Sequence, residues 1–286
     1  NESESVPVDR NSGHYSSEKT FYGIAQFDPK TFPKKENVVL IDDIGCWDQH
    51  GIYFSPKKQP EILEIKAGYL EMPAYGLAID LGSTSIAASL CDLSTGRIVD
   101  AKGTMNPQIR YGEDVMSRVS YTMLQKEGLK NLHSTVIKGL NDLIKNIVIE
   151  NKIKKDDIFE IVFVSNPIMH HLLLGIDPKE LGLAPFPLVH SASLNFKANE
   201  IKIKGNRESY IYTVPCVGGH VGADAAAVII SEQPEKSSLN TLIIDIGTNA
   251  EIILSKNKRL YACSCPAGPA LEGAQISSGQ RAAPGA

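Results

Sequence analysis

The sequence lacks the features of several protein classes. Its five cysteines are few, odd in number and unevenly spread, which argues against the disulfide framework of a secreted protein and favours the cytoplasm. Lys and Arg total 29 against 33 Asp and Glu, so the net charge of −4 offers no cationic surface to nucleic acid or anionic lipid. No apolar run reaches the roughly 18 residues that a membrane-spanning helix needs. We therefore expect neither nucleic acid nor a membrane as a partner.

What is present is the composition of a globular protein, with 42% hydrophobic and 22% charged residues. A chain of 286 residues predicts about two domains. Residues 1–20 are polar and contain neither the basic nor the apolar region of a secretion signal, so we expect a disordered linker there. Residues 21–74 hold short β-branched and aromatic runs broken by Pro, Lys and Asn, which predicts a small β-rich segment.

From residue 75 onward, strand and helix patterns alternate. Strands are expected over residues 75–81, 85–91, 97–101, 159–164, 210–214, 242–246, 250–254 and 259–263. Helices are expected over residues 113–123, 132–147, 167–175 and 222–231, the first from the spacing of Val115, Val119 and Met123. This alternation, with hairpins at the start of each half, predicts an α/β fold with mixed sheets.

The most informative feature is an internal repeat at an offset of 165 residues. Ala78–Thr84 (AIDLGST) matches Ile243–Asn249 (IIDIGTN), and each copy begins within a predicted strand and is followed by a second strand, a polar turn with Arg and a third strand. A carboxylate at a strand end, followed by Gly and hydroxyl residues, gives an anchor for Mg²⁺ beside a turn whose amides can approach phosphate oxygens. One such turn is most often ordinary turn chemistry. Two copies with matched flanks instead predict a clamp for a polyphosphate.

The repeat resembles the two phosphate motifs of the actin, sugar kinase and heat-shock chaperone ATPase superfamily. Within it, five motifs in order are similar to the ATP-dependent reductive activators of corrinoid proteins: YGLAIDLGSTSIAASLCDLSTGRIV, YGEDVMSRVSYT, VSNPIMHHLLLGIDPKELGLAPF, VGGHVGADAAA, and LIIDIGTNAEIIL with SCPAGPALEGAQISSGQRAAPGA. The resemblance implies an actin-like, ribonuclease H-like fold with two related lobes. The first lobe is expected over residues 75–231, and residues 238–286 are expected to form only the start of the second.

The resemblance also implies a function. Members of the family use ATP and Mg²⁺ to drive reduction of cob(II)amide to cob(I)amide in a corrinoid methyl-carrier protein, with electrons arriving through an iron–sulfur domain. The corrinoid protein is thus the expected partner, and a homodimer is left open. The ferredoxin pattern C-x₄-C-x₂-C is absent, because Cys46 stands alone before the ATPase motifs. An adenosine-binding motif is expected beyond residue 286.

Chemistry and motif position together give the candidate site residues. Asp80 and Asp245 are the expected Mg²⁺ ligands, and a hard dication bound by few carboxylates plus phosphates suits them. Glu251 is placed by the resemblance to hold a metal-bound water, and Asp224 either to orient water or to stabilise the N-terminus of its helix. The expected phosphate contacts are Gly82, Ser83, Thr84, Gly247, Thr248 and Asn249, and Gly218 and Gly219 are expected to allow close approach of the lobes.

Other chemically notable residues have simpler explanations. Adjacent residues of a helix point about 100° apart, so His170 and His171 cannot share a metal and are expected in the core or an interface. Cys263 and Cys265 would share a strand face but lack the four ligands of a zinc or iron–sulfur site. Met123 is expected in the core. Arg118 is expected to be a solvated or helix-pairing charge, with a partner contact as the alternative.

Two other functions remain open from the sequence: a small-molecule kinase of the same superfamily, and a non-catalytic nucleotide sensor. The kinase would phosphorylate an added acceptor, whereas the sensor would bind nucleotide without turnover. Because residues 238–286 contain no helix to cover their sheet, we expect an exposed apolar face there. The segment expressed alone is accordingly expected to be poorly soluble and to bind ATP weakly.

Overall fold

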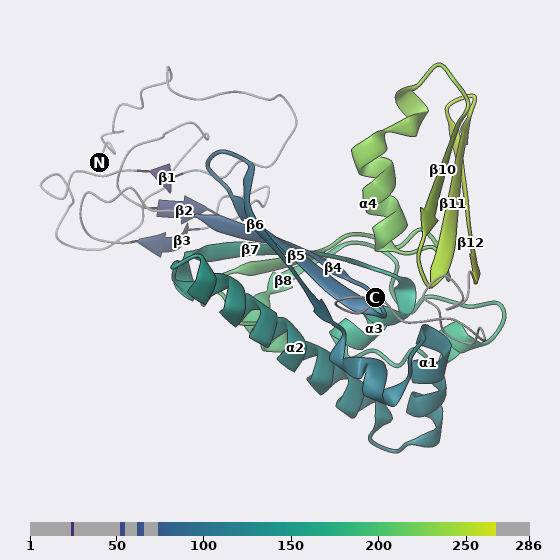
Figure 1. Ribbon diagram of the computed structural model, residues 1–286, viewed down its shortest axis with the longest axis horizontal. Helices are drawn as coiled ribbons and strands as arrows, with labels where there is room; N and C mark the ends of the chain where they lie inside the picture. Colours follow the sequence, from purple (N-terminus) through teal and green to yellow (C-terminus); the bar gives the residue numbers. More distant parts are fainter. Residues whose placement is uncertain (1–23, 26–51, 55–61, 66–73, 267–286) are drawn as a thin grey trace, which may run out of the picture.

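The computed structural model describes residues 24–25, 52–54, 62–65 and 74–266 (Figure 1). The predicted linker over residues 1–20, most of the predicted β-rich segment over residues 21–74 and the C-terminal residues 267–286 lie outside the described residues. Within the predicted β-rich segment, three short strands pair antiparallel in the order β1-β2-β3. They are β1 (Ile24–Ala25), β2 (Ile52–Phe54) and β3 (Ile62–Ile65).

The largest sheet has six strands in the order β6-β5-β4-β7-β9-β8. The first three form an antiparallel meander of β4 (Tyr75–Leu81), β5 (Ser85–Asp92) and β6 (Arg97–Met105). Next to β4, the strands β7 (Ile158–Ser165) and β9 (Tyr210–Thr213) run parallel to it, and β8 (Leu194–Lys197) closes the sheet antiparallel to β9. The predicted mixed sheet is therefore confirmed.

The strand β8 was not predicted from the sequence. It is four residues long, reads Leu-Asn-Phe-Lys, and pairs only with β9 at the sheet edge. A short edge strand of this kind carries almost no periodic signal, because one neighbour and little burial constrain its residues. Short 3₁₀ turns were likewise not predicted: η1 (Pro107–Tyr111), η2 (Lys155–Asp157), η3 (Lys179–Gly182), η4 (Ala198–Ile201) and η5 (Pro234–Lys236).

Three helices cover one face of the six-stranded sheet: α1 (Val115–Leu124), α2 (Gly128–Glu150) and α3 (Pro167–Leu174) (Figure 1). The predicted apolar stripe of α2, from Leu132 to Ile147, is buried against the inward residues of β4, β5 and β7. Helix α3 begins at Asn166, whose side chain accepts a hydrogen bond from the Met169 amide at 2.9 Å. It ends at Gly175, whose φ of 70° suits glycine, as predicted.

The buried face of α1 differs from the prediction. Its buried residues are Val115, Arg118, Val119 and Thr122, which follow the i, i+3, i+4, i+7 pattern of one helix face. Met123, expected in the core, lies beside this face and is 51% exposed. Arg118, expected to be solvated, lies on the face and is fully buried. Both predictions were wrong because the buried face of α1 includes Arg118 and Thr122. The sequence-based assignment had instead extended that face from Val119 to Met123.

Helix α4 (Ala223–Glu232) joins this lobe to a second sheet, β10-β11-β12, which is antiparallel throughout (Figure 1). The strands are β10 (Thr241–Ile246), β11 (Asn249–Lys256) and β12 (Arg259–Pro266). Ala223 packs with Val162 and Val164 on the open face of the large sheet, while Ala225 packs with Ile253 of β11. The helix thereby fixes the two hairpins of the repeat relative to each other.

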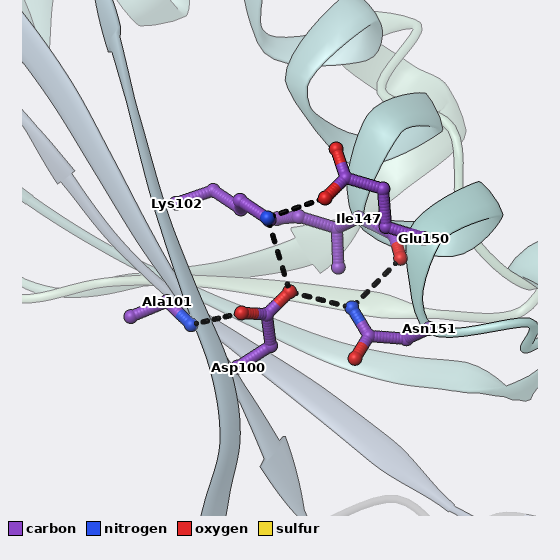
Figure 2. A network of polar contacts seen from close by, with 6 residues as sticks. All are labelled: Asp100, Ala101, Lys102, Ile147, Glu150 and Asn151. Carbon is purple, nitrogen blue, oxygen red and sulfur yellow. Dashed lines mark hydrogen bonds and ion pairs between the residues drawn. The ribbon is translucent and has the colours of Figure 1, made fainter.

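A polar network fastens the edge strand β6 to the end of α2 (Figure 2). Lys102 forms an ion pair with Glu150, and Asn151 donates a hydrogen bond from Nδ2 to Asp100 Oδ2 at 2.7 Å. The same amide donates to the Ile147 carbonyl at 2.9 Å. Asp100 and Lys102 pair with Leu90 and Ala88 of β5, so the network joins the middle of the edge strand to the end of α2.

Candidate functional site

The two hairpin turns of the repeat meet in the structure. Thr84 follows β4 and Thr248 follows β10, and their Oγ1 atoms are 3.2 Å apart although 164 residues separate them in the chain. The predicted pairing of the two turns is therefore present. Both turns present hydroxyl and amide groups where a phosphate chain would be clamped from two sides.

Two buried polar side chains, Asn106 and Arg118, form hydrogen bonds to the backbone carbonyls of the first turn. Asn106 donates from Nδ2 to the Gly82 carbonyl and from its backbone amide to the Thr84 carbonyl, each at 2.8 Å. Arg118 donates from Nη2 to the Ser83 carbonyl. Three successive carbonyls thus point into the protein. Because the carbonyl and amide of a trans peptide point in opposite directions, the amides of residues 83–85 are turned the other way.

Gly82 is required by the same packing. A Cβ at this position would lie 2.5 Å from the Ser85 carbonyl oxygen, a separation that side chains do not tolerate. In the second turn a Cβ at Gly247 would lie 3.4 Å from the Asn249 carbonyl oxygen, which is ordinary contact. A side chain is therefore excluded sterically at position 82 but not at position 247.

Sequence reasoning missed Asn106 and misjudged Arg118. The Asn106-Pro107 pair was a usable signal, because Asn before Pro marks the start of a turn or helix, and Asn106 does cap η1. Nothing in the sequence around Arg118 indicated burial, since two acidic residues, Glu113 and Asp114, precede it and suggest a charged surface.

The four candidate carboxylates converge from both lobes. Asp80 and Asp245 are solvent-accessible at the ends of β4 and β10. Glu251 lies directly opposite Asp245 in the β10–β11 register and is buried, accepting a hydrogen bond from Ser264 Oγ at 2.9 Å. Like charges in directly opposed positions destabilise a sheet. Such a local conflict is typical of functional sites.

Asp224 reaches this group from the first turn of α4. Its Oδ1 accepts a hydrogen bond from the Ala225 amide at 2.8 Å within that turn, and a role in stabilising the helix stays a prediction. The preceding Gly222 lets the helix approach β7, since a Cβ there would lie 2.4 Å from the Ser165 carbonyl oxygen. The role in orienting water stays a prediction.

Electrostatic coupling ties the carboxylates together. Burial raises the pKa of Asp224 to about 6; the Ala225 amide opposes this shift, and the charges of Glu251, Asp80 and Asp245 add to it. Burial also raises the pKa of Asp80, with Asp245 acting in the same direction. For Glu251, burial raises the pKa, the Ser264 hydrogen bond lowers it and Asp245 raises it. A cation between the lobes would relieve this mutual repulsion.

The donors fit Mg²⁺ better than a transition metal or a cluster. Carboxylate oxygens are the ligands Mg²⁺ prefers, and the ion ordinarily keeps several waters and substrate phosphates. Within the described residues, no three His, Cys, Asp or Glu side chains are grouped so as to hold a metal by themselves. Cys263 and Cys265 share one exposed face of β12, as predicted, with no further ligand in the part of the chain that the structure describes. Cys46 lies outside the described residues.

The remaining candidates lie away from the turns. His170 and His171 are buried in α3, which confirms their core placement. Close packing is present at Gly219, where a Cβ would lie 2.3 Å from the Phe186 carbonyl oxygen, but Phe186 belongs to the first lobe. At Gly218 a Cβ would meet no described atom within 4 Å. The expected close approach of the lobes at Gly218 and Gly219 therefore stays a prediction.

Comparison with known proteins gives consistent matches. A family profile described as "RACo middle region" matches residues 75–237, and one described as "C-terminal domain of RACo the ASKHA domain" matches residues 239–286. The chain is 35% identical over 216 residues to the corrinoid activation enzyme RamQ of Eubacterium limosum, covering 76% of this chain and 36% of that protein. It is 30% identical over 227 residues to the Co(II) methylated amine-specific corrinoid protein reductase of Methanosarcina barkeri, covering 74% and 40%.

Among solved structures, the reductive activator for corrinoid, iron-sulfur protein superposes with a TM-score of 0.74 at 34% identity. The match covers 82% of this chain and 37% of that one, so the chain spans less than half the length of these relatives. The superposition and the ASKHA profile confirm the actin-like α/β fold. Among the described helices, none is long and apolar enough to cross a membrane.

Proposed function

The chain belongs to the RACo family of reductive activators of corrinoid proteins, and we propose that it forms the phosphate-clamping part of an ATPase that drives such an activation. The observation that carries the proposal is the meeting of the two turns, with Thr84 and Thr248 in contact and four carboxylates around them. The names of the relatives, which concern corrinoid activation and corrinoid protein reduction, support the choice of partner.

In this proposal the chain's residues bind and orient the nucleotide. The outward amides of residues 83–85 and the turn at residues 247–249 hold the phosphates, while Asp80 and Asp245 hold Mg²⁺ directly or through its waters. The ion would neutralise phosphate charge and the charge that develops in the transition state. Asp224 and Glu251 would orient a water for attack on the terminal phosphate.

Hydrolysis of ATP to ADP and phosphate transfers no electron, so the electron that converts cob(II)amide to cob(I)amide must come from a reductant. The resemblance assigns that task to an iron–sulfur domain, for which the described residues supply no ligand set. Nucleotide can promote the reduction only by favouring a state of the protein in which the bound corrinoid is easier to reduce. The two turns, held on different sheets and joined by α4, are the elements whose separation the nucleotide would set.

The test uses the full-length protein with a corrinoid protein and a low-potential reductant under anaerobic conditions. We expect Mg²⁺-dependent ATP hydrolysis that the corrinoid protein stimulates, and cob(I)amide formation that requires ATP. A rate of ATP hydrolysis that the corrinoid protein does not change, together with phosphorylation of an added small acceptor, would support a kinase instead. Nucleotide binding without turnover under any of these conditions would support a sensor.

A further inference from the structure

Arg118 is a buried cation whose guanidinium contacts the backbone of the first turn at Ser83. It is fully buried, and its guanidinium donates to four groups on three other parts of the lobe. Nε donates to the Gly112 carbonyl at 3.1 Å, Nη1 to Gln108 Oε1 at 3.3 Å and to Met169 Sδ at 3.1 Å, and Nη2 to the Ser83 carbonyl. All of these partners are neutral.

The positive charge of Arg118 has no partner of opposite sign in contact. Within residues 74–266, Arg118 forms no ion pair. Asp114 acts on it through space, but the Asp114 carboxylate accepts hydrogen bonds from the Ser117 amide at 2.8 Å and the Ser117 hydroxyl at 2.9 Å. A buried charge is costly unless an opposite charge compensates it. Among the described residues, Arg118 therefore lacks a counter-charge in direct contact.

The neighbouring groups indicate where that counter-charge belongs. Arg118 holds the Ser83 carbonyl inward, so the Thr84 amide of the same peptide is directed away from Arg118. The side-chain hydroxyl of Thr84 contacts Thr248 of the second turn. An anion bound to this amide would be separated from the guanidinium by a single peptide unit. Because Arg118 is fully buried, solvent would screen this attraction weakly.

We propose that Arg118 is a positioning residue that acts through Ser83 and serves as the internal counter-charge for a polyphosphate bound at the first turn. This inference rests on the proposed nucleotide function and adds a residue to it. It predicts that Arg118 contributes to the recognition of phosphate charge, and not to the recognition of the nucleoside. It also links phosphate binding to α1, η1 and α3, since the same guanidinium contacts Gly112, Gln108 and Met169.

The experiment measures binding of adenosine, ADP and ATP to the full-length protein by calorimetry, with Mg²⁺ and ionic strength fixed. Arg118→Met removes the charge at similar length, and Arg118→Lys keeps it. Arg110→Met is the matched control, because Arg110 is exposed, donates to Thr135 Oγ1 at 3.0 Å and makes no contact with the turn. We expect Arg118→Met to weaken ATP binding on the order of tenfold, ADP binding by less, and adenosine binding by less than about twofold.

Arg118→Lys is expected to keep the wild-type preference for ATP over adenosine within about threefold, and Arg110→Met to leave it unchanged. If Arg118→Met weakens adenosine and ATP equally, or lowers only the melting temperature, Arg118 has a structural role alone and the inference fails. If Arg118→Met does not fold, Arg118→Lys tests the inference by itself. A tenfold loss of the preference for ATP over adenosine in Arg118→Lys would show that a positive charge at this position is not sufficient, and the inference would fail. If the wild-type protein binds no nucleotide, the proposed function itself fails.

Discussion

Leu81 in the first hairpin of the repeat is fully buried, whereas its counterpart Ile246 in the second is 63% exposed. The first hairpin has the α1–α3 layer on one face, and the second packs one face on α4. On the other face of the second sheet, Leu242 and Ile244 are also more than half exposed. One sequence pattern therefore forms the same hairpin in two different environments.

The two turns also differ in length and support. Four residues separate the paired Leu81 and Ile86, but three separate the paired Ile246 and Ala250. As a result Asp80 lies opposite Ala87, whereas Asp245 lies opposite Glu251. The first turn is supported by side chains from outside the hairpin, and the second is closed by its own Gly247 amide bonding to the Asn249 carbonyl at 2.8 Å. The two copies of the repeat therefore share an aspartate at the strand end but differ in how the turn after it is supported.

The largest expected effect concerns the feature the two hairpins share. Asp80→Ala and Asp245→Ala should each lower the ATPase rate of the full-length protein on the order of 10² to 10³-fold, because each removes a carboxylate proposed to hold the metal. Neither should lower the melting temperature, since both side chains are accessible to solvent. Asp92→Ala, in the β5–β6 turn where the Asp92 carboxylate accepts hydrogen bonds from Ser94 and Thr95, is the control. Unchanged activity and nucleotide affinity in both variants would refute the site assignment.

The next effect concerns packing, where the hairpins should differ. Leu81→Ala should lower the free energy of unfolding by about 2 to 5 kcal/mol, because it opens a cavity in the core. Ile246→Ala should lower it by less than about 1 kcal/mol, because its side chain loses little burial. Chemical denaturation of both variants measures the difference. Equal costs would show that the exposed face of the second sheet is covered in solution.

The glycines of the two turns provide a third comparison. Gly82→Ala should cost about 1 to 3 kcal/mol of unfolding free energy, because its Cβ would collide with the Ser85 carbonyl oxygen. Gly247→Ala should cost less than about 1 kcal/mol, since its Cβ would meet the Asn249 carbonyl oxygen at contact distance. Thermal melts of the pair test this. A larger loss in Gly247→Ala would mean that the second turn is the more constrained.

The smallest expected effect concerns Asp224, which lies between the hairpins. Its folded pKa of about 6 exceeds the usual aspartate value, so the ionised side chain destabilises the fold once the pH rises above that usual value. Without nucleotide or Mg²⁺, Asp224→Asn should raise the free energy of unfolding by about 1 kcal/mol at about pH 8. The gain should vanish toward about pH 4, where wild-type Asp224 is protonated.

The neighbours of Asp224 sharpen this last prediction. Glu251 raises the pKa of Asp224 more than Asp80 does, so Glu251→Gln should lower that pKa more than Asp80→Asn. Carbon NMR of the Asp224 carboxyl during a pH titration measures both shifts. A larger shift in Asp80→Asn would place Asp224 with the first hairpin instead of the second.

Much of the fold follows from local sequence pattern. Residues Leu132, Val136 and Leu140 recur at helical spacing, and Pro167 and Gly175 mark the start and end of α3, so these helices were predicted closely. The hairpins followed from alternation and turn residues. The strand β8 escaped because tertiary pairing with β9, not periodicity, holds its four residues in place.

The candidate site was partly predictable for the same reason. Asp80 and Asp245 are marked by a motif, so their place at strand ends could be read from the residues themselves. The sequence around Asn106 indicates only a turn, and the acidic residues before Arg118 suggest an exposed charge instead of a buried one. Their contacts with the turn at residues 82–84 join parts of the chain more than 20 residues apart, which no local pattern encodes.

The sequence by itself determined the repeated Asp-x-Gly turns, the positions of the four helices to within four residues at each end, and the strands after residue 74 apart from β8. These features depend on backbone preferences and on the spacing of apolar residues. Tertiary structure alone decided that Thr84 meets Thr248 and that Glu251 faces Asp245. It also decided that Arg118 is a buried cation. These outcomes depend on how α1 and α4 pack, since packing sets which side of a helix is buried and how far apart two turns lie.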